Sequence, residues 1–162
     1  MKNEAPDELK EALSKAADIL TFADNTEKKL REKLKRKGFE DETIDKAVLR
    51  LQNAGLLDDE RLMLSNVESI ANSKLYGRGR IKIELLKKGF QPELINGNFE
   101  KCTEDIDFKN NCYKLVKRKG LVLKFIDRET RNKVTAALVR YGYNYAEIKF
   151  ALEKVLKENE EN

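Results

Sequence analysis

The chain has 162 residues, of which 40% are hydrophobic, 38% are charged and 7% are aromatic, and its net charge is +4. This balance favours helices with one apolar stripe and wide charged faces. It disfavours a sheet protein, which would need more β-branched and aromatic residues. Two prolines in the whole chain leave long stretches free to be helical.

Histidine is absent, which removes the commonest general base from any catalytic scheme. Cys102 and Cys112 fit no disulfide framework and no metal spacing, so we expect no enzymatic activity, no metal and no cofactor. Residues 1–20 alternate charged and apolar side chains, unlike a signal peptide, and no apolar run approaches the length of a membrane span. A reducing, cytoplasmic location is the expectation that follows.

The first predicted unit covers residues 7–55 and contains three helices. Its middle helix carries Leu30 and Leu34 four positions apart, which places both on one face. Gly38 then occupies the first position after the helix, where a left-handed backbone favours glycine. The sequence predicts that Phe39 packs back onto Leu34 as the hydrophobic contact of this helix end.

The second predicted unit covers residues 56–103. Asp58 is a good N-cap for its first helix, and Gly89 ends its middle helix with Phe90 packed on Leu85. Pro92 is placed to occupy the first position of the third helix. Between the first two helices, residues 77–80 (Gly-Arg-Gly-Arg) are predicted to form a flexible basic turn.

The third predicted unit covers residues 104–158. Its middle helix ends at Gly142 with Tyr143 packed on Leu138, and Asn144 is placed to cap the last helix. An apolar connection at 121–125 precedes the middle helix, and the sequence assigns it no role.

These segments are three copies of one pattern, aligned on glycines 38, 89 and 142, which are 51 and 53 residues apart. An isoleucine follows each glycine six positions later, at 44, 95 and 148. The predicted fold is therefore all-α, with three tandem three-helix, helix-turn-helix-like repeats in an elongated, curved array. Fifty residues in three short helices bury little surface alone, so we expect neighbouring units to pack on each other.

Positive charge gathers in three segments of the body. Residues 28–37 hold seven basic side chains against one acidic, residues 74–88 hold six against one, and residues 109–124 hold six against none. Clusters of this kind indicate a face that meets an anionic partner, such as nucleic acid or an acidic protein surface. A solvated helix face is the alternative for each cluster.

Sequence-specific DNA reading is disfavoured, although each predicted unit has the outline of a helix-turn-helix reader. In such a reader the final helix would enter the groove with Arg, Asn or Gln at its start. Here the final helices begin at residues 41–43, 92–94 and 145–147, and each of these starts carries at least one carboxylate. A carboxylate at the point of groove entry would repel the phosphates.

The chain resembles the RecX family of recombination regulators. The motifs that carry this resemblance run over nearly the whole chain, in order: Lys37-Gly38-Phe39, Gly55-Leu56-Leu57-Asp58-Asp59, Gly77-x-Gly79-Arg80-Ile81-x-x-Glu84-Leu85-x-x-Lys88-Gly89, and Arg140-Tyr141-Gly142-Tyr143-Asn144-Tyr145-x-x-Ile148. It departs from the family pattern at Leu62-Met63, at Lys29, where the family has a capping-box Glu, and at Lys74, which stands where several arginines are typical.

The resemblance implies a regulator without catalytic activity that acts as a monomer. Family members bind the filament that the RecA recombinase forms on single-stranded DNA, and they inhibit filament growth, ATP hydrolysis and strand exchange. Carried over by position, the first-choice contact residues are Arg78, Arg80, Lys82, Lys87 and Lys88, and the second-choice residues are Lys33, Arg36, Lys117, Arg118 and Lys119. The alternative is a protein that coats single-stranded nucleic acid without sequence preference, although the low aromatic content disfavours stacking platforms.

Overall fold

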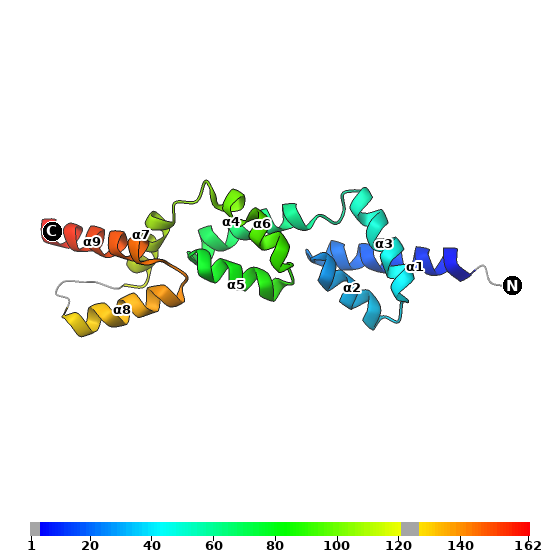
Figure 1. The fold of residues 1–162 in the computed structure, drawn as a ribbon, viewed down its shortest axis with the longest axis horizontal. Helices are drawn as coiled ribbons and strands as arrows, with labels where there is room; N and C mark the ends of the chain where they lie inside the picture. Colours follow the sequence, from blue (N-terminus) through cyan, green and yellow to red (C-terminus); the bar gives the residue numbers. More distant parts are fainter. Residues whose placement is uncertain (1–3, 121–126) are drawn as a thin grey trace.

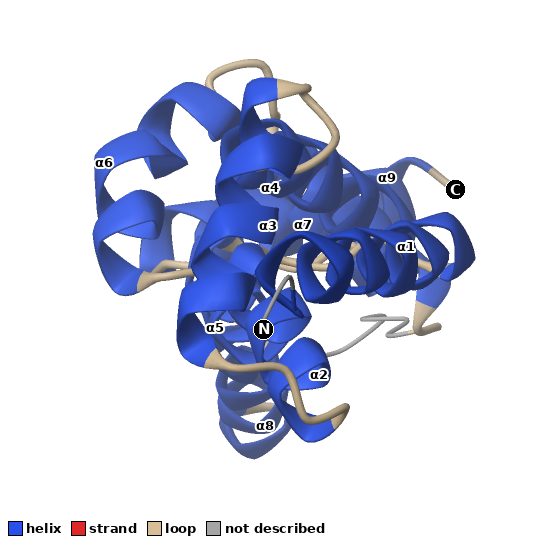
Figure 2. Cartoon of the chain, turned by 90° about the vertical axis from the view of Figure 1, so that its right-hand side faces the viewer, coloured by secondary structure: helices blue, strands red, loops and turns tan. Residues whose placement is uncertain are grey.

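The computed structural model describes residues 4–120 and 127–162, and all the regular structure in those residues is helical. The helices lie in a row of three successive groups, with the two chain ends at opposite ends of the row (Figure 1). Viewed along the row, the described residues form only helices and connecting loops (Figure 2). The predicted all-α array of three-helix repeats is confirmed, and it is elongated.

Within residues 4–120 and 127–162, each group contains three α-helices, and the second group also contains one π-helical segment. The first group consists of α1 (Glu4–Phe22), α2 (Glu27–Arg36) and α3 (Asp41–Asn53). The second consists of α4 (Asp59–Ser69), the π-helix η1 (Ile70–Lys74), α5 (Arg78–Lys88) and α6 (Pro92–Thr103). The third consists of α7 (Phe108–Arg118), α8 (Arg128–Arg140) and α9 (Tyr145–Glu161). In the described residues no helix is long and apolar enough to cross a membrane.

The three glycines of the repeat end the middle helices as predicted. Their φ angles are positive, 95° at Gly38, 95° at Gly89 and 93° at Gly142. In each case the amide of the following aromatic residue donates to the carbonyl five residues earlier, at 3.4, 3.2 and 3.2 Å respectively. This is the hydrogen bond of a Schellman helix end, and glycine is required because a Cβ is unfavourable in the left-handed region.

The predicted helix starts are also confirmed. The carboxylate of Asp58 accepts a hydrogen bond from the amide of Arg61 at 3.0 Å. Asn144 accepts from the amide of Glu147 at 2.9 Å, and Glu147 accepts in return from the amide of Asn144 at 2.9 Å, which completes a capping box. Pro92 begins α6, where its missing N–H has no partner to lose.

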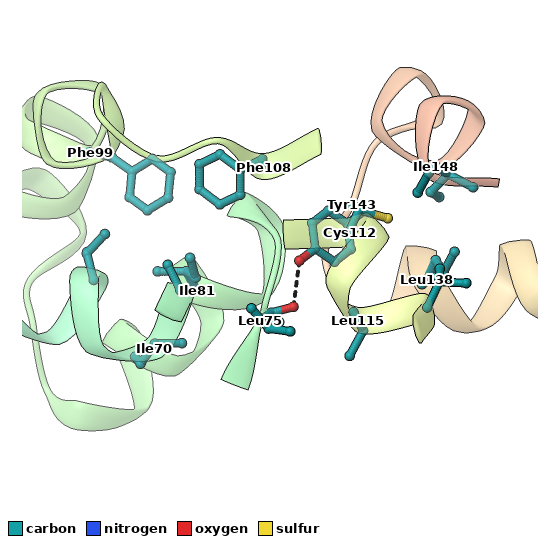
Figure 3. Close-up of a cluster of buried hydrophobic side chains, with 14 of the residues drawn as sticks. Ile70, Leu75, Ile81, Phe99, Phe108, Cys112, Leu115, Leu138, Tyr143 and Ile148 are labelled. Atoms are coloured by element: carbon teal, nitrogen blue, oxygen red, sulfur yellow. Dashed lines mark hydrogen bonds between the residues drawn. The ribbon is translucent and has the colours of Figure 1, made fainter. Parts of the chain in front are cut away.

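The second and third groups share one continuous core, whereas the first group has cores of its own. The shared core joins side chains from both groups around Tyr143, which is buried (Figure 3). The Tyr143 hydroxyl donates to the carbonyl of Leu75 at 2.6 Å. Leu75 follows the π-helix with a φ of 54°, a conformation that leucine seldom adopts. A buried hydrogen bond therefore connects the end of this unusual segment to the next group.

Backbone contacts join the same two groups at Gly77 and Gly79. The amide of Gly77 donates to the carbonyl of Tyr141 at 2.8 Å, and the amide of Gly79 donates to that of Gly142 at 3.1 Å. A Cβ on Gly77 would lie 2.4 Å from the carbonyl carbon of Gly142. The prediction of a flexible basic turn at 77–80 is wrong, because Gly77 caps α5 and α5 begins at Arg78. Because neither has a Cβ, Gly77 and Gly142 permit a close approach of the two backbones.

The junction between the first and second groups has a similar arrangement, in which a side chain takes part in each contact. The Thr26 hydroxyl caps α2 and donates to the carbonyl of Lys88 at 3.4 Å, beside the turn at Gly89. The carboxylate of Asp59 accepts from the amide of Glu27 at 3.0 Å, and burial raises the pKa of Asp59. At both junctions, the start of one middle helix therefore lies against the glycine turn of the next middle helix.

Gly97 lies inside α6 without a structural requirement for glycine. It is exposed, it has no positive φ, and a Cβ there would meet no atom within 4 Å. We therefore expect Gly97→Ala to raise the free energy of unfolding by about 0.5–1 kcal/mol, because alanine loses less backbone entropy in a helix. Urea denaturation followed by circular dichroism measures the change. A loss of stability would contradict the open surroundings of this position.

The apolar connection at 121–125 lies outside the described residues, so its role stays open.

Candidate partner-binding surface

Arg78 is the first residue of α5, and its side chain points into the junction between the second and third groups. Its Nη1 atom lies 2.5 Å from Oε1 of Glu147, whose side chain is only 5% exposed. Its guanidinium carbon lies 4.1 Å from the centre of the Phe108 ring. Arg78 therefore connects two groups of the protein, because its guanidinium contacts both the carboxylate of Glu147 and the ring of Phe108. Solvent reaches 41% of its side chain.

The next two first-choice residues contact their own group. Arg80 pairs with Glu84 at 3.1 Å, and its guanidinium carbon lies 5.4 Å from the centre of the Tyr76 ring. Lys82 is half-buried, with its ammonium 4.6 Å from the centre of the Phe99 ring. Both cations still reach the surface, but aromatic rings hold them in place.

The last two first-choice residues, Lys87 and Lys88, are exposed at the end of α5. Lys87 lies 3.5 Å from Glu84 and keeps 61% of its side chain in solvent. Lys88 precedes the glycine turn, and its side chain is exposed. Both lysines complement the negative end of the helix dipole and remain open to an anionic partner.

The second-choice residues of the first group lie on α2. Lys33 is half-buried and donates to the side-chain oxygen of Asn25 at 2.7 Å. Arg36 is the last residue of the helix and is exposed. The structure therefore leaves Arg36 as the more accessible cation of this pair.

The second-choice residues of the third group end α7 and differ in their partners. Lys117 pairs with Glu158 at 3.1 Å, and this carboxylate also accepts the Tyr113 hydroxyl at 2.6 Å. Hydrogen bonds from Tyr113 and Lys117 lower the pKa of Glu158, and the hydrogen bond to Glu158 raises the pKa of Lys117. Lys117 is thus engaged within the protein, although its side chain is 53% exposed.

Arg118 turns toward the second group, whereas Lys119 lies against a ring of its own group. The guanidinium of Arg118 donates to the carbonyls of Ser73 and Lys74 at 2.8 and 2.9 Å. The ammonium of Lys119 lies 5.4 Å from the centre of the Tyr141 ring. Both side chains are exposed, so the third group contributes two accessible cations at this junction.

Two tyrosines and four cations meet at this junction, and we call them the junction patch. The ring centres of Tyr76 and Tyr141 are 5.8 Å apart and the rings are tilted by 54°. Lys74 lies 5.6 Å from the centre of the Tyr76 ring. The members of the junction patch are Lys74, Tyr76, Arg80, Arg118, Lys119 and Tyr141.

Sequence reasoning selected Arg80, Arg118 and Lys119 but missed Lys74 and both tyrosines of the junction patch. A signal was present, since Tyr76 and Tyr141 each directly precede a glycine of the family motifs. Tyr76 and Tyr141 come together because Gly77 and Gly142 lie against each other, and these two glycines are far apart in the chain.

Neither cysteine has the properties of a catalytic nucleophile. Burial raises the pKa of the Cys112 thiol to about 12, and burial also raises the pKa of Cys102. The thiolate is the reactive form of cysteine, so these shifts oppose reactivity. Across residues 4–120 and 127–162, no group of three His, Cys, Asp or Glu residues is placed to hold a metal ion.

Comparisons with known proteins connect this chain to a family. Residues 12–51 match the family profile described as the first three-helix domain of RecX. Regulatory protein RecX of Clostridioides difficile is 33% identical over 149 residues, which cover 92% of this chain and 70% of that protein. Regulatory protein RecX of Prosthecochloris aestuarii is 29% identical over 147 residues, which cover 91% of this chain and 95% of that protein.

Solved structures show the same fold. The crystal structure of RecX from Lactobacillus salivarius superposes with a TM-score of 0.77 at 19% identity, over 93% of this chain and 97% of that one. A second crystal structure of a regulatory protein RecX also has a TM-score of 0.77, at 22% identity and over 92% of this chain.

Proposed function

This chain belongs to the RecX family of regulatory proteins, and we propose that it binds the RecA recombinase filament on single-stranded DNA. In binding, it inhibits filament growth, ATP hydrolysis and strand exchange. It acts in the cytoplasm, as a monomer, and without catalysis of its own. Because the filament is an assembly of identical subunits, the contacts that one group of helices makes with one subunit can recur between the next group of helices and the next subunit.

The observation that carries this proposal is the spread of accessible cations along an elongated row of groups (Figure 1). The first group exposes Arg36, the second exposes Lys87 and Lys88, and the third exposes Lys119. On a repeating partner, the second and third contacts form at a high effective concentration once the first has formed. Individually weak ionic contacts therefore add up on a filament and lose that advantage on dispersed subunits.

Lys87 and Lys88 offer the clearest test of the ionic contacts. We expect Lys87→Glu with Lys88→Glu to weaken binding to recombinase filaments by about tenfold or more, because two cations that approach an anionic surface become repulsive. Both lysine side chains are exposed, and the junction contact at Lys88 is made by its backbone carbonyl, so the fold should be kept. A titration onto filaments assembled on single-stranded DNA measures the affinity, and inhibition of ATP hydrolysis gives a second readout.

A matched control reverses two lysines outside the predicted surface. Lys46 and Lys133 are exposed and pair only locally, with Glu42 at 2.7 Å and Glu129 at 2.6 Å. Lys46→Glu with Lys133→Glu changes the net charge by the same four units, from +4 to zero, since each replacement contributes −2. Equal losses from both double variants would show that net charge alone controls binding. No binding of the unaltered protein to filaments would refute the proposed function.

A further inference from the structure

We propose that the junction patch binds single-stranded DNA, with a base stacked on the tyrosine pair and flanking phosphates neutralised by the surrounding cations. The inference rests on the proposed function for the origin of this DNA, which is the strand within the recombinase filament. Binding to a bare strand should occur as well, because the patch contains every group that the contact needs.

The two rings form a composite aromatic surface at the seam between two groups of helices. Tyr76 precedes α5, Tyr141 directly follows α8 as its C-cap, and both side chains are partly exposed. The amide of Gly77 holds the carbonyl of Tyr141 at 2.8 Å, directly beside Tyr76 in the chain. This hydrogen bond fixes the spacing of the two tyrosines, so the aromatic surface is formed before any ligand arrives.

Positive charge surrounds the rings on both sides of the seam. The ammonium of Lys74 and the guanidinium of Arg80 lie over the Tyr76 ring, and the ammonium of Lys119 lies over the Tyr141 ring. Two backbone carbonyls hold Arg118 in place. Within the described residues, the four cations have one carboxylate in ion-pair contact, Glu84 on Arg80. The patch therefore has a surplus of positive charge.

The combination of rings and cations favours a single-stranded nucleic acid over other anions. An acidic protein surface would engage the cations but would not use the exposed part of the rings. Duplex DNA presents phosphates but keeps its bases stacked inside. A single strand offers an unstacked base for an aromatic face and phosphates on either side for the cations. The cation–π contacts hold the cations over the rings, within reach of the phosphates on either side of a base that stacks on the exposed part of the tyrosine pair.

The test measures equilibrium binding to a dT oligonucleotide and to an abasic oligonucleotide of the same length, at matched salt and without recombinase. The chain contains no tryptophan, so quenching of its tyrosine fluorescence can be followed without a tryptophan background. We expect tighter binding to dT than to the abasic strand. Tyr76→Leu and Tyr141→Leu should each weaken binding to dT by about fivefold or more and leave abasic binding nearly unchanged.

Two further variants test whether the aromatic rings of the junction patch are responsible for binding to dT. Tyr76→Phe keeps the aromatic face and should retain dT binding. Tyr145→Leu is the matched control, because Tyr145 is 74% exposed and lies outside the junction patch. Its replacement should leave the preference for dT intact. Circular dichroism of each variant checks that the helices are kept.

The cations provide a measurement that does not depend on replacing a ring packed at the seam. Lys74→Ala with Lys119→Ala removes two exposed charges. We expect this change to reduce the slope of log affinity against log salt by about 1.4, since each phosphate contact on a single strand contributes about 0.7. An unchanged slope would overturn the inference even if the tyrosine variants failed to fold.

Several outcomes distinguish this inference from the proposed function. Unchanged dT binding in both leucine variants would overturn the inference. Loss of filament binding in those variants, with bare-strand binding intact, would also overturn it, because the patch would then contact protein. If the unaltered protein binds dT through stacking but does not bind filaments, the proposed function is refuted and the inference about the junction patch is supported.

Discussion

Gly142→Ala should lower the free energy of unfolding by about 2–5 kcal/mol. The left-handed backbone at φ 93° costs a residue with a Cβ about 1–2 kcal/mol. The added Cβ would also lie 2.3 Å from the backbone nitrogen of Arg80 and 2.8 Å from the carbonyl oxygen of Gly77. Backbone atoms cannot move aside as a flexible side chain can, so the two groups would have to separate, at a further cost of about 1–3 kcal/mol.

The repeat supplies matched controls for this effect. Gly38 has nearly the same φ of 95°, but a Cβ there meets nothing within 4 Å, so Gly38→Ala should cost about 1 kcal/mol. Gly89 is intermediate, because its Cβ would lie 2.9 Å from the Thr26 hydroxyl oxygen and 3.1 Å from Lys29 Cγ. Thermal and urea unfolding of the three variants measures the series. Equal losses at all three glycines would show that the backbone angle alone is responsible.

Arg78→Leu should lower the free energy of unfolding by about 2 kcal/mol. The change removes the cation that lies 2.5 Å from Glu147 and leaves a carboxylate with a 5% exposed side chain without its ion pair. A charged group that is buried without its partner is costly. Solvent reaches 41% of the Arg78 side chain, and this exposure keeps the loss below that of a fully buried pair.

A double-mutant cycle with Glu147→Gln isolates the contribution of the ion pair. Glutamine keeps an oxygen that can accept from the amide of Asn144, so the capping box is largely retained. In the Arg78→Leu background, Glu147→Gln should therefore cost less than it does in the unaltered protein, because no charge is left unpaired. Denaturant unfolding of the four proteins gives the coupling. Additive losses would show that the two side chains do not interact.

The contacts of Arg78 decide which residues of the basic cluster 74–88 can report on filament binding. Arg78 was selected from the sequence as a partner contact, but in the structure it connects α5 to α9 and to the Phe108 ring. A charge reversal at Arg78 would weaken the junction between groups before it reported on any partner. Lys87 and Lys88 carry the same sign of charge at an exposed helix end, so they are the better probes of the filament.

Features whose causes lie within a few residues of one another could be predicted from the amino-acid sequence. The Schellman end at Gly38 needs only the carbonyl of Leu34 and the amide of Phe39, and both are visible in the repeat. The cap at Asn144 needs only Glu147, three residues later. Helix ends, caps and the all-α class could therefore be predicted, because short-range geometry is the same wherever the segment is placed.

Features that depend on contacts between groups could not be predicted from the sequence, because they form only when distant segments pack together. The paired glycines 77 and 142, the ion pair of Arg78 with Glu147, and the tyrosines of the junction patch each join residues that are far apart in the chain. The π-helix and left-handed Leu75 belong to the same class, since the carbonyl of Leu75 accepts from Tyr143 in the next group. Local propensity disfavours a left-handed leucine, and only packing against a neighbouring group can offset that cost.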